Sequence, residues 1–279
     1  MTEANSSYSY SQGVQLLERM VQEFGPIFTI EQITSSVENQ QLSSRQIQKL
    51  ISKLANSGWI EILKRGTYVV KRSLNSGEIP LFAIAAALVQ PMAISHWSAL
   101  AYHGFTTQNP AMIQASTPHK VVTPEMRSGK AYSPRGRATW RAFSLEFEFI
   151  YTKRELFWGF QRIWVNSWQQ VEITDPERTA LDLITRPDIF GGISSASEIL
   201  EGGISQINIE RLVSYALRYD VGAIIKRLGW ILEKIGVSSE HLNPLRDYPV
   251  QGYYLLDPNQ PKNAKLNQHW RMNENLGRT

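Results

Sequence analysis

The sequence contains no cysteine in its 279 residues, which excludes disulfides and every thiolate metal site. Charged residues are also few, at 19%, and no apolar run approaches the ~20 residues of a membrane-spanning helix. The longest candidate, residues 81–89, stops before Pro91. The N-terminus lacks a basic stretch followed by an apolar one, so we expect no secretory signal and a cytoplasmic protein.

The composition indicates a folded, basic protein of two domains. Hydrophobic residues make up 42% of the chain, and its length exceeds that of most single domains. The net charge is only +4, but the pI of about 9.2 favours a polyanionic partner. The position of the basic residues is therefore a better guide to such a partner than their total number.

Hydrophobic spacing predicts three short helices in the first sixty residues. They cover residues 12–24, a segment opening at Thr29, and residues 43–56 after a turn at residues 39–42. Both Thr29 with Gln32 and Ser43 with Gln46 have the spacing of a capping box. Two β-prone segments, 59–63 and 67–70, then flank a basic turn at residues 64–66. This order is typical of a winged helix-turn-helix.

The third helix predicts a DNA-reading surface. Its apolar residues form one stripe, and at about 100° per residue the opposite face is basic and amide-rich. Residues 40–72 contain seven basic residues against the single acid Glu61, a balance of +6. We expect this helix in the major groove and the wing on the backbone or minor groove. The predicted DNA-binding residues are Ser44, Arg45, Gln46, Gln48, Lys49, Ser52, Lys53, Asn56, Lys64, Arg65, Thr67 and Tyr68.

If these residues neutralise about five phosphates, the logarithm of the DNA-binding constant should fall against log salt with a slope of about −4.5. A winged helix used for protein docking, or a face that is merely solvated, is the alternative.

The polar segment 73–80, with Gly77 and Pro80, predicts a domain boundary. We therefore divide the chain into residues 1–74 and a larger α+β domain, 75–279. Two apolar helices are expected at 81–89 and 95–104, β-like pieces from 112 to 168 and helices after Asp175. One strand is expected at residues 143–150, where apolar and polar residues alternate. Dense tryptophans in this region are expected in the core: Trp140, Trp158, Trp164 and Trp168.

A second basic segment lies in the larger domain, with a balance of +5 between residues 120 and 141. It is either a solvated loop or a second contact with nucleic acid, DNA or RNA. Its basic residues are Lys120, Arg127, Lys130, Arg135, Arg137 and Arg141.

Histidines and carboxylates in the larger domain are interpreted as structural. His96 and His103 are seven residues apart on one helix, roughly 10 Å along its axis, too far to share one metal ion. His119 is a loop residue or a phosphate contact. Asp175 and Glu177, with Pro176 between them, suit the start of a helix better than a metal site. Phosphate-binding glycine loops are absent, so we expect no cofactor, no metal and no enzyme activity.

Several segments of the larger domain resemble one known family. They are residues 94–110, residues 173–184 with Pro187 and Gly191-Gly192 after them, Arg227-Leu228-Gly229, and the tail Trp270-Arg271-Met272-Asn273. Their order and spacing resemble the AbiEi family, the antitoxins of type IV toxin–antitoxin systems. The resemblance extends over nearly the whole chain, including the winged helix in front.

This resemblance implies a repressor that binds promoter repeats of its own operon through the N-terminal domain. The C-terminal domain would counter a nucleotidyltransferase-like toxin, with or without direct contact. Two competing functions remain: a protein-interaction module that neutralises a partner by binding it, and a metal-dependent enzyme acting on nucleic acid through Asp175, Glu177 and Asp182.

Overall fold

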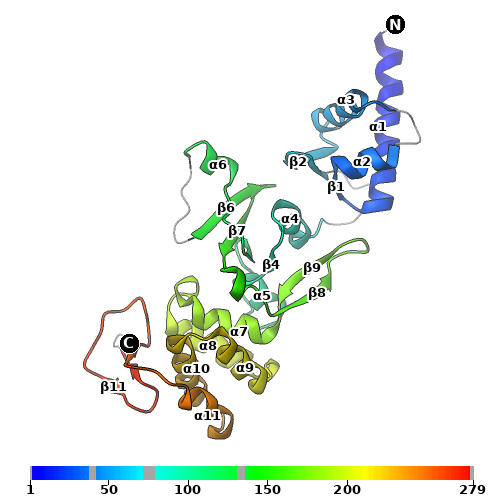
Figure 1. Cartoon of the computed structure of the whole chain (residues 1–279). Helices are drawn as coiled ribbons and strands as arrows, with labels where there is room; N and C mark the ends of the chain where they lie inside the picture. Colours follow the sequence, from blue (N-terminus) through cyan, green and yellow to red (C-terminus); the bar gives the residue numbers. More distant parts are fainter. Residues whose placement is uncertain (1, 38–41, 72–78, 131–135, 277–279) are drawn as a thin grey trace. The chain divides into compact units, whose positions relative to one another are not determined.

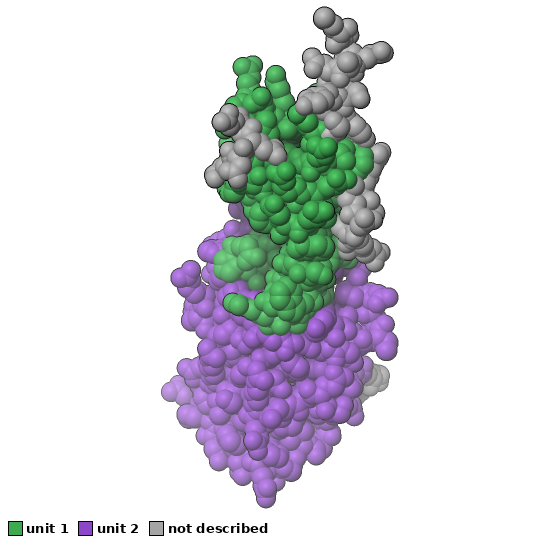
Figure 2. Space-filling view, turned by 90° about the vertical axis from the view of Figure 1, so that its right-hand side faces the viewer, with its two compact units in different colours: residues 1–92, 141–145, 162–171 green, residues 93–140, 146–161, 172–279 purple. Residues whose placement is uncertain are grey.

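The structure, a computed structural model, describes residues 2–37, 42–71, 79–130 and 136–276. The chain forms two compact units, shown in different colours in Figure 2. Unit 1 comprises residues 1–92, 141–145 and 162–171, and unit 2 comprises residues 93–140, 146–161 and 172–279. The predicted boundary at residues 73–80 falls largely outside the described residues, so the cut between residues 74 and 75 stays a prediction.

Unit 1 has the element order predicted for a winged helix (Figure 1). Its elements are α1 (Thr2–Phe24), β1 (Ile27–Thr29), α2 (Ile30–Val37), α3 (Ser44–Asn56), β2 (Ile60–Lys64), β3 (Thr67–Val70) and α4 (Leu81–Leu88). Helix α1 begins ten residues before the start predicted from its apolar stripe. The predicted turn at residues 39–42 lies, except for Leu42, outside the described residues.

The core of unit 1 lies between these helices and a three-stranded sheet of order β1-β3-β2. Both pairings are antiparallel, with Ile27 opposite Val69 and Ile60 opposite Val70. Apolar residues from α1, α2 and α3 meet on this sheet, among them Leu17, Met20 and Ile33, each at most 1% exposed.

Unit 2 is a mixed α+β unit, so the predicted fold class is confirmed. Most of a six-stranded sheet of order β6-β7-β5-β4-β9-β8 belongs to it, with β5 parallel to β7 and antiparallel to β4. Residues 141–142, 162–164 and 170–171 of this sheet are assigned to unit 1. The strands are β4 (Ala93–Ile94), β5 (Ile113–Thr117), β6 (Arg137–Ala142), β7 (Leu145–Tyr151), β8 (Phe160–Trp164) and β9 (Gln170–Thr174). The short helices between them are α5 (His96–Tyr102), α6 (Pro124–Arg127) and η3 (Arg154–Leu156).

A helical bundle with its own apolar core follows the sheet. It contains α7 (Pro176–Thr185), η4 (Pro187–Phe190), α8 (Ile193–Gly203), η5 (Ile204–Gln206), α9 (Ile209–Tyr219), α10 (Gly222–Ile235) and α11 (Ser239–Asp247). Most residues of α7 and of α10 are buried on every side, as expected for central helices. Three two-residue strands close the chain: β10 (Tyr254–Leu255), β11 (Leu266–Asn267) and β12 (Met272–Asn273).

The strand predicted at residues 143–150 is partly wrong. Phe143 and Ser144 have φ angles of 53° and 60° and form the two-residue turn of a hairpin between β6 and β7. The alternating pattern also misleads, because Phe147, Glu148, Phe149 and Ile150 are all buried. Both faces of β7 are therefore covered.

Of the four tryptophans predicted to lie in the core, one is buried, Trp140 is half-buried and two are exposed. Trp158 is 9% exposed, but Trp164 is 66% and Trp168 38% exposed. Trp168 instead lies beside the end of α1, where its indole Nε1 donates to the carbonyl of Gln22 at 3.0 Å.

Candidate functional site

Helix α3 begins at a complete capping box and buries one apolar stripe. The backbone N of Gln46 donates to Ser43 Oγ at 3.4 Å, and Gln46 Oε1 accepts from the backbone N of Ser43 at 2.8 Å. Ile47, Leu50, Ile51 and Leu54 are at most 8% exposed. This stripe fixes which side of the helix faces the core and which faces solvent.

The opposite side of α3 forms a continuous exposed surface, which we call the α3 face. It comprises Ser44, Arg45, Gln46, Gln48, Lys49, Ser52, Lys53 and Asn56, all exposed as predicted. The helix contains three basic residues and no acidic one. Because Gln46 already serves the capping box through its side-chain oxygen, its amide nitrogen is the group left for another contact.

The wing offers fewer contacts than the sequence predicted. Arg65 is exposed at the turn, where Gly66 adopts a φ of +75°. Lys64, however, is half-buried, and its Nζ donates to the carbonyl of Leu88 at 3.0 Å. Thr67 is only 6% exposed, and Tyr68 packs against Phe28 with ring centroids 6.2 Å apart. Arg65 is thus the predicted wing residue with an exposed side chain.

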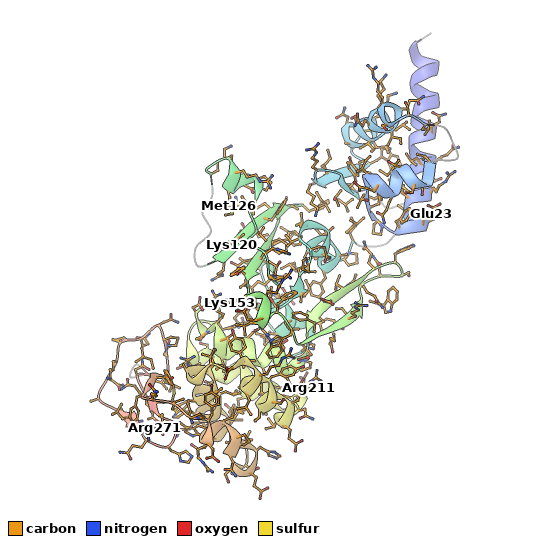
Figure 3. All side chains as sticks on the ribbon, in the orientation of Figure 1. Glu23, Lys120, Met126, Lys153, Arg211 and Arg271 are labelled. Carbon is orange, nitrogen blue, oxygen red and sulfur yellow. The ribbon has the colours of Figure 1, made fainter. Side chains whose placement is uncertain are left out.

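Three acidic residues of unit 1 lie on the two helices that precede α3, and Glu61 lies on β2. Glu18 and Glu23 belong to α1, where Figure 3 labels Glu23, and Glu31 belongs to α2. Hydrogen bonds from the first turn of α2 and from Thr29 lower the pKa of Glu31. Positive charge therefore gathers on α3 and negative charge on the two helices before it, as expected for a surface that meets phosphate.

The second basic segment does not form one set of available cations. Lys120, labelled in Figure 3, is exposed, as are Arg127 and Lys130. Arg137 is half-buried and holds buried Glu148 through two hydrogen bonds of 2.8 and 3.0 Å. Arg141 is exposed but belongs to unit 1. Arg135 lies outside the described residues.

Asp175 and Glu177 are used structurally at the start of α7. Asp175 Oδ1 accepts from the backbone N of Arg178 at 2.8 Å, which confirms the predicted N-cap. Its Oδ2 binds Arg211 at 2.7 Å and the hydroxyl of Tyr215 at 2.8 Å. Glu177 accepts from the backbone N of Asn208 at 2.9 Å. Both carboxylates thus bind groups at the start and in the first turns of α9. Arg211, which is labelled in Figure 3, belongs to this helix.

Sequence reasoning did not identify these α9 partners. Arg211 and Tyr215 are four residues apart and therefore share a helix face, and the guanidinium donates to the tyrosine hydroxyl at 2.9 Å. That spacing was visible in the sequence. Their pairing with Asp175, thirty-six residues away for Arg211, depends on tertiary folding.

Further along α7, Arg178 makes a second buried network. Its Nε donates to Asp182 at 3.0 Å, and its guanidinium lies over the ring of Trp158 at 4.8 Å from the centroid. Arg218 contacts the same ring at 4.1 Å. The carboxylates proposed in the enzyme alternative are therefore all tied to arginine or backbone groups. Over the described part of the chain, no three histidine or carboxylate side chains are grouped so that they could hold a metal ion.

The histidines of unit 2 have different partners and do not share a site. His103 Nε2 lies 2.7 Å from the carbonyl of Thr174, and His96 Nδ1 lies 2.7 Å from Ser95 Oγ. His96 is buried, stacks on Phe190, and has a φ of +53°. Burial lowers its pKa to about 4, so the ring is neutral at pH 7. His119 is exposed.

None of the described helices is both long enough and apolar enough to cross a membrane.

Comparison with known proteins gives a family and a fold. A family model described as the AbiEi antitoxin C-terminal domain matches residues 92–234. The crystal structure of the RV2827C protein from Mycobacterium tuberculosis is similar in fold, with a TM-score of 0.63 at 16% sequence identity. That match covers 95% of this chain and 90% of the other. A search of curated proteins finds no match.

Proposed function

Because this chain belongs to the AbiEi antitoxin family, we propose that it is an antitoxin that also represses transcription of its own operon. In this proposal the α3 face binds promoter repeats in double-stranded DNA. Unit 2, which contains most of the matched domain, counters a nucleotidyltransferase-like toxin encoded beside it. The protein acts by binding and is not an enzyme.

The observation that carries the DNA-binding part is the α3 face itself. Three basic side chains and several amide or hydroxyl groups lie on one exposed side of a helix that a capping box and an apolar stripe hold in place. Arginine and lysine pair with guanine, and asparagine and glutamine pair with adenine, in the major groove. Arg65 on the adjacent wing adds a contact to the DNA backbone.

The test is promoter binding by variants of this face. Arg45→Ala or Lys49→Ala should weaken binding to the chain's own promoter by ~1–3 kcal/mol if the lost contact is to a base. Gel-shift titration against promoter and random DNA measures the loss, and a thermal melt establishes that each variant is folded. Lys262→Ala, which removes an exposed lysine of unit 2, is the matched control. Equal affinity for promoter and random DNA would refute specific repression.

A second candidate function is direct neutralisation of a partner protein. It is favoured by Trp164, which is 66% exposed on β8, at the edge of its sheet. Exposed tryptophans often anchor protein interfaces, and edge strands offer unpaired backbone groups. Co-purification with the neighbouring gene product, lost in Trp164→Ala and unaffected by Lys49→Glu with Arg65→Glu, would support this candidate.

A further inference from the structure

Unit 1 contains a cleft that the proposed DNA-binding surface does not use. Its volume is about 460 Å³, within the range of small-molecule sites. Three alanines of α4, Ala83, Ala86 and Ala87, form one wall. The segment 168–171, strand β1, Gln32 of α2 and the root of the wing contribute the others, together with Gln90. All of these residues belong to unit 1.

The cleft holds a cation without a carboxylate partner. Lys64 lines it, and its Nζ donates one hydrogen bond, to the carbonyl of Leu88 at the end of α4. None of the described residues that line the cleft is acidic. An ammonium group has three donors, and burial without a counter-ion is unfavourable. Burial lowers the pKa of Lys64, in keeping with this position. An anion in the cleft would supply the missing partner.

The cleft also presents an aromatic surface that is held in place. Trp168 lines it and is 38% exposed. Its indole Nε1 is fixed by Gln22, and its backbone N donates to Asn166 Oδ1 at 2.9 Å. Gly25, with a φ of +83°, lies against the same side chain, since a Cβ there would be 3.1 Å from Trp168 Cγ. The ring is therefore pre-organised to stack on a planar group.

Amide side chains supply both hydrogen-bond donors and an acceptor. Gln32 Oε1 already accepts from the backbone N of Thr29, and Gln169 Oε1 accepts from Asn166 Nδ2. Their Nε2 groups remain as donors. Gln90 instead donates Nε2 to the carbonyl of Ala86, so its oxygen remains as an acceptor. Together with one ammonium and one indole, these groups form a set that can recognise a polar ring bearing negative charge.

We propose that this cleft binds a small anion carrying a planar ring, with its charge at Lys64 and its ring against Trp168. Both nucleoside monophosphates and aromatic carboxylates have this chemistry. A site in this position would give the DNA-binding unit a ligand of its own. Binding is tested without DNA, so its failure is distinguishable from failure of the proposed repressor function.

Calorimetry with matched charged and neutral probes tests the proposal. The full chain is titrated with AMP against adenosine, and with 4-hydroxybenzoate against 4-hydroxybenzamide, at concentrations up to about 1 mM. We expect at least one charged probe to bind about tenfold or more tightly than its neutral counterpart, because a charge-assisted hydrogen bond is lost in the neutral one. The pair of probes that shows this difference tells whether the anionic group of the ligand is a phosphate or a carboxylate.

Variants locate the binding. Lys64→Met should weaken it about tenfold or more, and Ala87→Phe, which fills the cleft while leaving Lys64 in place, should abolish it. The difference in fluorescence between the wild type and Trp168→Phe gives the emission of Trp168 apart from the other seven tryptophans. The probe should quench this emission in the wild type. Lys262→Met is the matched control and should bind as wild type. Absence of binding for every probe, or binding as tight as wild type in both Lys64→Met and Ala87→Phe, would overturn the proposal.

Discussion

The salt dependence of promoter binding can be worked out from the cations that the structure leaves exposed. On α3 and the wing these are Arg45, Lys49, Lys53 and Arg65. Lys64 is not counted because it is half-buried, with its Nζ on the carbonyl of Leu88. At about 0.9 per neutralised phosphate, four contacts give a slope of about −3.6 for log binding constant against log salt. Binding should weaken about 50-fold between 100 and 300 mM salt.

Fluorescence anisotropy with a labelled promoter fragment, measured at five or more salt concentrations, gives this slope. Lys71 is also excluded from the count, because it follows β3 and lies on neither α3 nor the turn of the wing. Lys49→Ala should reduce the slope by about 0.9, to about −2.7. Lys71→Ala should leave it nearly unchanged. A slope that does not respond to Lys49→Ala, or that drops by about 0.9 in Lys64→Met, would refute this assignment of contacts.

Two further predictions concern unit 2. A Cβ at Gly229 would lie 2.0 Å from the buried ring of Trp270, so Gly229→Ala should destabilise the unit by roughly 3 kcal/mol in urea denaturation. Gly252→Ala, whose Cβ meets nothing within 4 Å, should not. Burial lowers the pKa of His96 from 6.5 to about 4, so the unfolded chain binds the proton more readily. Stability contributed by neutral His96 is complete above pH 6.5 and is lost as the pH falls towards 4. His96→Asn, which tolerates positive φ, should flatten that part of the urea-midpoint profile, and an unchanged profile would contradict the assignment.

Elements set by local sequence could be predicted. The limits of α3, its capping box and its buried stripe all follow from residues at most four positions apart, so they were readable without tertiary information. The N-cap at Asp175 is of the same kind. The α3 face followed directly, because fixing the buried stripe of a helix also fixes its exposed side.

Features that depend on distant partners could not be predicted. Lys64 looked like a wing-tip cation, but its Nζ bonds to a carbonyl twenty-four residues away. Glu148 looked like a solvent-facing strand residue, yet Arg137 and Gln114 satisfy it in the interior. In both cases the sequence shows the chemistry of the side chain but does not identify the distant residue that it contacts.

The segments that carry the family resemblance are largely structural. Gly229 leaves room for Trp270, whose indole donates to Glu233 at 2.8 Å. Arg227 is buried and donates to the carbonyls of Leu256, Leu255 and Ile184, while burial lowers its pKa to about 10. Because such residues maintain the fold, the resemblance identifies the antitoxin domain without locating the surface that acts on a toxin. That surface has to be sought among exposed residues such as Trp164, through variants that leave this interior intact.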